Sequence, residues 1–85
     1  MKIKITVEEK LLRYFKNNFP ALKKLKNIPK NTSLAELGYL DSFAIIDMVT
    51  FIETTWKIKI EDKDITSKKM GSINKMVDFI NKKIN

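Results

Sequence analysis

The chain has 85 residues and a net charge of +7, and it contains neither histidine nor cysteine. This length gives room for one domain with a single hydrophobic core. Without histidine and cysteine the chain cannot form disulfides, thiolate nucleophiles or histidine-based triads, and it lacks the usual ligands of zinc and haem. No apolar run approaches the roughly 20 residues that span a bilayer, and no secretory signal is evident at the amino terminus. We therefore expect a cytoplasmic protein.

The positive charge is distributed unevenly along the chain. Residues 31–56 contain no lysine or arginine and carry a charge of −4, so the remainder carries +11. The four acids in this segment are Glu36, Asp41, Asp47 and Glu53. Lysine, isoleucine and asparagine together supply 35 of the 85 residues, a bias that an AT-rich genome produces without selection for a basic surface. We therefore expect a polarised molecule that offers one acidic side despite its basic total.

The first expected element is a helix over about residues 6–18. Thr6 and Glu9 have the spacing of a capping box, and apolar side chains then recur at helical intervals. Pro20 ends this helix, because the residue before a proline disfavours the α region. A short further turn of helix is expected near residues 22–25.

A long loop is expected over residues 27–40. Pro29 and Gly38 are among the breakers that interrupt regular structure there. We expect Leu34 and Leu37 to attach this loop to the core.

The second helix is expected over residues 42–56, and its apolar side chains fall on two faces. At 100° per residue one narrow stripe forms the core face. This stripe consists of Ile45, Met48, Val49, Ile52 and Trp56. Phe43, Ile46 and Thr50 lie on a different face, beside Asp47. Exposed apolar groups flanked by a carboxylate are typical of a docking surface, whereas a bundle that buries this helix on both sides would explain the same pattern.

The last third of the chain predicts an extended connector over residues 57–60 and a short third helix near residues 62–69, capped by Asp62 or Asp64. A strongly amphipathic last helix follows the cap residue Ser72. The architecture expected is an all-α bundle of three main helices and one short helix, with a long first loop.

Asp41 and Ser42 open the second helix. Both residue types are preferred N-caps, each contributing about 1 kcal/mol relative to alanine, so a purely structural role is one interpretation. The other is covalent modification by a partner enzyme. No histidine is present to activate Ser42 as a nucleophile, whereas the amides and dipole of an exposed helix amino terminus stabilise an attached phosphate.

Residues 34–43, with the sequence Leu-Ala-Glu-Leu-Gly-Tyr-Leu-Asp-Ser-Phe, resemble the prosthetic-group site of the acyl carrier protein superfamily, whose signature is of the Gly-x-Asp-Ser-Leu type. The resemblance continues over about residues 6–84. In that family a phosphopantetheinyl transferase esterifies the serine with 4′-phosphopantetheine from coenzyme A. The resemblance implies that Ser42 is the attachment site and that Asp41 helps to orient the transferase and its metal.

The resemblance also implies a single carrier-protein domain, residues 1–85, that is a monomer and not itself an enzyme. The thiol of the prosthetic arm would hold an acyl or aminoacyl cargo as a thioester and carry it between partner enzymes. Those partners are an adenylate-forming acyl or aminoacyl ligase, an acyltransferase or a ketosynthase. The second helix is the usual recognition element of the family, so docking roles fall to Phe43, Ile46, Asp47 and Glu53.

Three residues depart from the family pattern. Phe43 stands where leucine is commonest, Ala44 where an acid is frequent, and Lys57 where glycine is usual. Carriers of bulk fatty-acid synthesis are usually strongly acidic, unlike this chain. Asp-Ser-Phe resembles the D-alanyl carrier proteins and stand-alone carriers that work with adenylate-forming ligases, which favours a specialised pathway.

Two other functions fit parts of the sequence. One is a small basic helical domain that binds nucleic acid, although the acid-only segment argues against it. Its contacts would come from Lys23, Lys24, Lys26, Lys30, Lys68, Lys69, Lys82 and Lys83. The other is a carrier-like fold that has lost modification and serves as an interaction module, which the intact Asp41-Ser42 pair disfavours.

Overall fold

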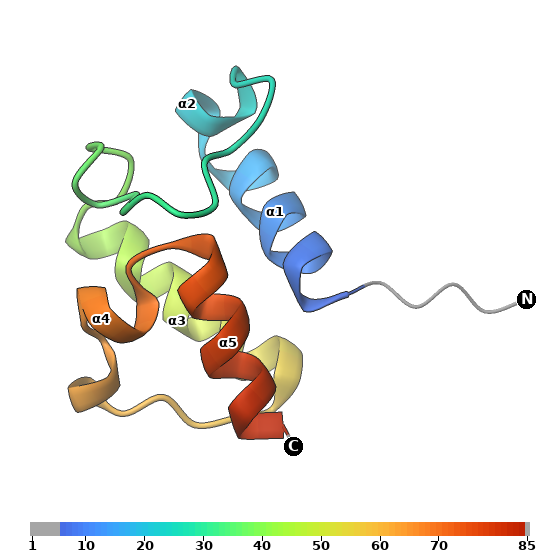
Figure 1. Cartoon of the computed structure of the whole chain (residues 1–85), viewed down its shortest axis with the longest axis vertical. Coiled ribbons are helices and arrows are strands. Elements are labelled where there is room, and N and C mark those ends of the chain that lie inside the picture. Colours follow the sequence, from blue (N-terminus) through green and yellow to red (C-terminus); the bar gives the residue numbers. More distant parts are fainter. Residues whose placement is uncertain (1–5, 85) are drawn as a thin grey trace, which may run out of the picture.

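The computed structural model describes residues 6–84 and folds them into five α-helices and one 3-10 turn, with no strand in this range (Figure 1). The long helices are α1 (Val7–Asn18), α3 (Ser42–Trp56) and α5 (Ile73–Ile84). The short elements are α2 (Pro20–Lys23), the 3-10 turn Asp62–Asp64 and α4 (Ser67–Met70). The predicted small all-α bundle is confirmed.

The boundaries of the first two helices follow from capping and from proline. The Thr6 hydroxyl accepts a hydrogen bond from the Glu9 N–H at 3.1 Å, which satisfies one of the free donors at the start of α1. Phe19 is extended and ends α1. Pro20 then occupies the first position of α2, where its missing N–H costs nothing. The expected extra turn therefore starts slightly earlier than the sequence predicts.

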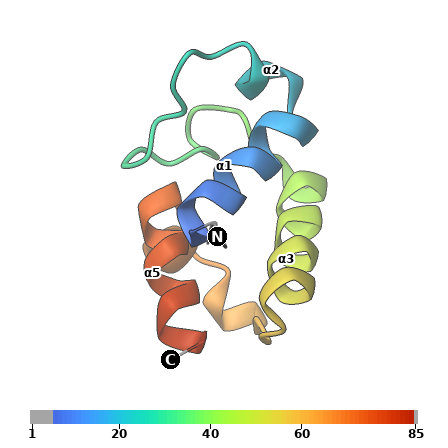
Figure 2. The ribbon, with the colours of Figure 1, turned by 90° about the vertical axis from the view of Figure 1, so that its right-hand side faces the viewer.

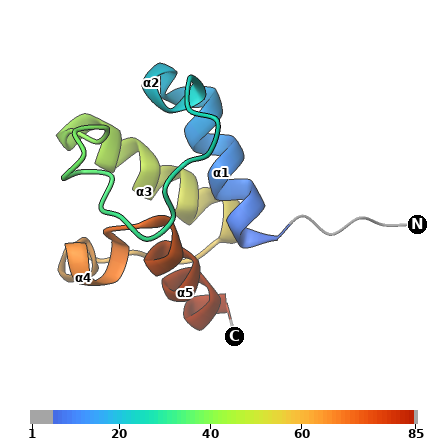
Figure 3. The same cartoon turned by 45° about the horizontal axis from the view of Figure 1, so that its top comes forward.

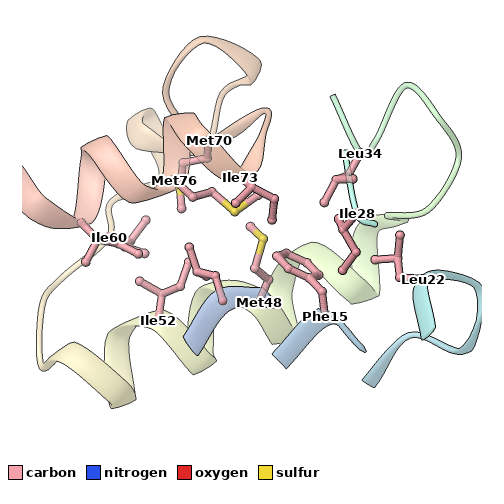
Figure 4. Close-up of a cluster of buried hydrophobic side chains, with 12 residues drawn as sticks. Phe15, Leu22, Ile28, Leu34, Met48, Ile52, Ile60, Met70, Ile73 and Met76 are labelled. Carbon is pink, nitrogen blue, oxygen red and sulfur yellow. The ribbon is translucent and has the colours of Figure 1, made fainter. Parts of the chain in front are cut away.

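One apolar core lies between the three long helices. Figure 2 shows α1 lying across one side of the pair formed by α3 and α5, and α5 packs against α1, α3 and α4. Phe15, Met48 and Met76 come together at its centre (Figure 4). The complete set of buried apolar side chains is Leu11, Phe15, Leu22, Ile28, Leu34, Met48, Ile52, Ile60, Met70, Ile73, Met76 and Ile80.

The long loop between α2 and α3 is attached to the start of α5 (Figure 3). Leu34 is fully buried, and its N–H donates to the Gly71 carbonyl at 3.2 Å. The Asn74 N–H, in the first turn of α5, donates to the Lys30 carbonyl at 3.0 Å. Leu37, by contrast, is 46% exposed, so its predicted role as a second anchor is wrong. It lies in a surface turn of which only the first apolar side chain reaches the core.

Helix α3 ends at Lys57, which adopts the left-handed conformation with φ of 54°. Glycine is the usual residue there because it has no Cβ, so lysine costs on the order of 1 kcal/mol. The connector that follows turns its two isoleucines inward, as predicted. Ile60 is buried, and the half-buried Ile58 packs against the core.

The predicted third helix over residues 62–69 is divided into a 3-10 turn and α4. Asp64 is only 4% exposed and accepts hydrogen bonds from the Lys69 ammonium at 2.9 Å and from the Glu61 N–H at 3.1 Å. Neither Asp62 nor Asp64 is the cap residue, because Glu61 occupies that position. The hydrogen bond from Lys69, and then that from Glu61, lowers the pKa of Asp64. The Asp64 carboxylate thus connects the turn to α4.

The Asp64 contacts predict a pH-dependent contribution to stability. Because folding lowers the pKa of Asp64 from 3.8, its ion pair stabilises the fold above that pH and is lost as pH falls through the folded-state pKa. We expect urea denaturation to show that Asp64→Asn is less stable than the wild type at pH 7, and that the difference shrinks below pH 3.8. Asp62→Asn, at an exposed neighbour, is the control. A difference for Asp64→Asn that is constant from neutral to strongly acidic pH would contradict this account.

Candidate functional site

Ser42 is the first residue of α3 and is exposed to solvent. The preceding Asp41 is the N-cap, since its carboxylate Oδ1 accepts a hydrogen bond from the Ala44 N–H at 2.8 Å. The Ser42 hydroxyl has no hydrogen-bond partner within residues 6–84. The structural cap role therefore belongs to Asp41, and the Ser42 hydroxyl is accessible.

A tight turn brings the loop to the start of α3. The Ser33 hydroxyl accepts from the Glu36 N–H at 3.2 Å, and the Tyr39 N–H donates back to the Leu34 carbonyl at 3.0 Å. Gly38 between them has φ of 85°, a left-handed conformation that side chains with a Cβ avoid. The turn reverses the chain just after Leu34, whose side chain is buried in the core. Ser42 therefore begins its helix a few residues after a position that the core holds in place.

The amino terminus of α3 can stabilise an anion. Within the part of the chain that the structure describes, the N–H groups of Ser42 and Phe43 have no acceptor. Free first-turn amides and the helix dipole favour a phosphate at this position. Asp41 opposes it with its own negative charge, and residues 31–56 offer no cation along the chain. Within this segment a phosphate ester on Ser42 would therefore be stabilised by backbone amides and not by side-chain cations.

One face of α3 beside Ser42 remains uncovered. We call Phe43, Ile46, Asp47 and Thr50 the exposed face of α3. Phe43 is 82% exposed and Ile46 is 63% exposed, and the two polar members are exposed as well. The Thr50 hydroxyl donates back to the Ile46 carbonyl at 3.0 Å, which satisfies it within the helix. The alternative that the bundle buries this end of α3 on both sides is therefore wrong.

Glu53 differs from the other three residues expected to dock partners. It is half-buried, and its Oε2 accepts a hydrogen bond from the Ile60 N–H at 2.8 Å. This contact ties the end of α3 to the connector that follows it. Glu53 therefore has a structural role that its place in the sequence did not indicate.

The core face of α3 matches the predicted stripe, with the deepest burial at Met48 and Ile52. The half-buried members of the stripe are Ile45, Val49 and Trp56. Phe51, which the stripe does not include, stacks on Tyr14 of α1 with ring centroids 4.2 Å apart. Burial raises the pKa of Tyr14, and the negative charge of Asp47 raises it further. The exposed Asp47 therefore lies close enough to α1 for its charge to disfavour the ionised form of Tyr14.

An apolar hollow of about 120 Å³ lies next to this end of α3. Leu40, Ile45, Ile65 and Met70 contribute to its walls. A cavity of about 150 Å³ accepts benzene, so the hollow has room for a few carbon atoms only. The hollow could not be predicted from the sequence, because its walls come from a loop, from α3 and from α4.

The structure brings Ser42 and the exposed face of α3 together on one helix. No protein-family model matches this chain, and no curated protein is significantly similar to it. No helix among the described residues is long and apolar enough to cross a membrane. Function is therefore inferred from the geometry of Ser42 and its surroundings.

The contrast between Glu53 and Asp47 is testable. Glu53→Ala removes the acceptor of a half-buried N–H, so we expect the free energy of unfolding to fall by about 1–3 kcal/mol. Asp47→Ala removes an exposed carboxylate from the same helix and should change it by less than about 0.5 kcal/mol. Urea denaturation followed by circular dichroism measures both. Equal effects of the two substitutions would show that the Glu53 contact does not stabilise the fold.

Proposed function

We propose that this protein is a phosphopantetheine-dependent carrier protein in which Ser42 carries the prosthetic group. The observation that carries the proposal is the accessible Ser42 hydroxyl, which has no hydrogen-bond partner among residues 6–84 and stands at the head of α3, directly before the exposed Phe43. The resemblance of residues 34–43 to the carrier-protein attachment site adds to it. Asp41 supports the same assignment, because it fixes the helix start and leaves its neighbour without a capping role.

The chemistry of attachment makes limited demands on this chain. The Ser42 oxygen would form a bond to the phosphorus on the pantetheine side of the diphosphate bridge of coenzyme A. The bond from this phosphorus to the bridging oxygen breaks, adenosine 3′,5′-bisphosphate leaves with that oxygen, and the serine proton passes to a base of the transferase. Phosphoryl transfer of this kind depends on positioning and on charge stabilisation by a metal, both of which a partner enzyme can provide. This chain supplies an exposed alcohol and the free amides of Ser42 and Phe43.

When attached, the prosthetic group supplies a terminal thiol that holds an acyl or aminoacyl cargo as a thioester, a nucleophile that this cysteine-free chain lacks. The protein itself would then act by presenting Ser42 to successive enzymes. Besides the transferase, these are an adenylate-forming ligase and an acyltransferase or ketosynthase. The net charge of +7 and the Asp-Ser-Phe sequence favour a specialised pathway over bulk fatty-acid synthesis.

The exposed face of α3 is the proposed contact for those enzymes. Phe43 and Ile46 offer apolar area that water covers in the free protein, and Asp47 supplies a charge beside them. Apolar contacts flanked by complementary charge suit short-lived complexes, since the charge guides encounter and the buried area remains small.

Modification of Ser42 is tested by mass spectrometry. Incubation with coenzyme A, magnesium and a promiscuous phosphopantetheinyl transferase should add the mass of one phosphopantetheine to the wild type. Ser42→Ala should gain nothing, whereas Thr54→Ala, at an exposed hydroxyl near the other end of α3, should be modified like the wild type. Circular dichroism verifies that each variant is folded. A gain of mass by Ser42→Ala, or none by the folded wild type, would refute the proposal.

The docking face is tested by the rate of the same modification. Phe43→Ala and Ile46→Ala should each lower kcat/KM of the transferase by about tenfold, which corresponds to about 1.4 kcal/mol of lost contact energy. Their own stability should hardly change, because both side chains are exposed. Ile84→Ala is the matched control, since Ile84 is 45% exposed but lies on α5. Rates reduced equally by all three substitutions would contradict a specific docking face.

A further inference from the structure

A second concave surface lies between α4 and α5, and we call it the α4–α5 groove. It has a volume of about 580 Å³, and five lysines and two aspartates line it together with Phe79. Lys68 and Lys69 come from α4, whereas Lys82 and Lys83 come from the last turn of α5. Lysines from two different helices therefore face the same groove. This arrangement differs from a row of lysines along the solvent-exposed face of a single helix.

Two of the ammonium groups are held in place by the fold. Asp64 is 4% exposed and binds the Lys69 Nζ at 2.9 Å, so this side chain is anchored at the edge of the groove. The Lys83 Nζ lies 5.5 Å from the centre of the Phe79 ring. A cation at this distance from an aromatic face is attracted to it. The groove thus combines ammonium groups that are held in place with the apolar surface of the Phe79 ring.

The charge in the groove is not balanced by its own residues. Even with Lys75 left out of the count, the other four lysines against the two aspartates leave a formal excess of +2, and one of the aspartates is already engaged with Lys69. Like charges that face a common space repel one another, and an anion that contacts several of them removes that repulsion. A ligand with more than one negative charge binds most favourably, because each of its charges can contact a different ammonium group.

All the cations that line the groove are lysines. Lysine is a common ligand of phosphates and binds them as a point charge, without the planar fork with which arginine matches carboxylates and phosphates alike. The groove contains no arginine, and the one arginine of the chain, Arg13, lies on α1. The volume also lies within the range of about 300–1,000 Å³ that is typical of small-molecule sites.

We propose that the α4–α5 groove binds a compact ligand with two or more adjacent phosphates, of the nucleoside polyphosphate class. A compact ligand fits better than an extended nucleic-acid backbone, because exposed acids continue the chain next to Asp64 at Glu61 and Asp62. The half-buried Phe79 ring offers apolar area to the uncharged part of such a ligand. The site is independent of Ser42, which is on α3.

Isothermal titration calorimetry on the full, unmodified chain tests the groove with ATP, pyrophosphate and inorganic phosphate as probes. ATP and pyrophosphate should bind at least about tenfold more tightly than inorganic phosphate, because they meet several ammonium groups at once. The triple variant Lys68→Gln/Lys82→Gln/Lys83→Gln should weaken ATP binding by about tenfold or more. The control Lys23→Gln/Lys24→Gln/Lys59→Gln removes the same charge from exposed positions outside the groove and should stay within about twofold of the wild type.

Several results would overturn the proposal. Equal losses in the two triple variants would show that binding follows net charge alone. No binding of ATP or pyrophosphate by the folded wild type, or equal affinity for inorganic phosphate, would exclude a site for adjacent phosphates. Tighter binding of single-stranded DNA or of anionic vesicles than of ATP, with the same dependence on the groove lysines, would assign the surface to nucleic acid or membrane instead. Ser42→Ala should bind ATP like the wild type, so this test and the modification test can fail separately.

Discussion

The hydrogen bonds between the long loop and the start of α5 hold the rest of the structure in place. A helix start leaves backbone N–H groups without partners, and here the Lys30 carbonyl from the loop accepts the one from Asn74. In return Gly71, just before α5, supplies the acceptor for the N–H of the fully buried Leu34. Two segments about 40 residues apart in the sequence thus satisfy each other's polar groups. Because Leu34 is held in the core, the position of the turn that follows it is determined. The position of the start of α3 is determined in the same way.

The arrangement of α3 explains how an apolar side can remain in water on a stable helix. Met48 and Ile52 fill the core, and Phe51 finds a second partner in Tyr14 of α1, so the carboxyl-terminal part of the helix is covered on two sides. Its amino-terminal part borders the loop and α4, and the Phe43 side chain remains exposed to solvent. The carboxyl-terminal end of the helix therefore supplies stability and the amino-terminal end supplies an exposed surface, which fits the carrier role proposed above.

The sequence predicted the features that depend on short-range patterns. Helical spacing of apolar residues predicted all three long helices, and capping residues such as Thr6 and Asp41 predicted where they begin. It failed where the outcome depends on residues far apart in the fold. Leu37 has the spacing of an anchor but lies on a surface turn, and Glu53 bonds to a connector whose path was not known. Lys68, Lys69, Lys82 and Lys83 were candidate nucleic-acid contacts from the sequence, but the groove that they share could not be predicted, because they meet only after two helices have packed.

The separation of charge along the chain has a consequence for how other molecules approach. Residues 31–56, which form α3 and the loop before it, carry −4 while the remainder carries +11, so the protein is an electric dipole as well as a cation. In the cell its field extends over about 8 Å before ions screen it. For the enzymes proposed as partners, a basic docking surface would be turned towards α3 and away from the lysines elsewhere. The charge distribution would then select the orientation of an encounter before any side chains touch.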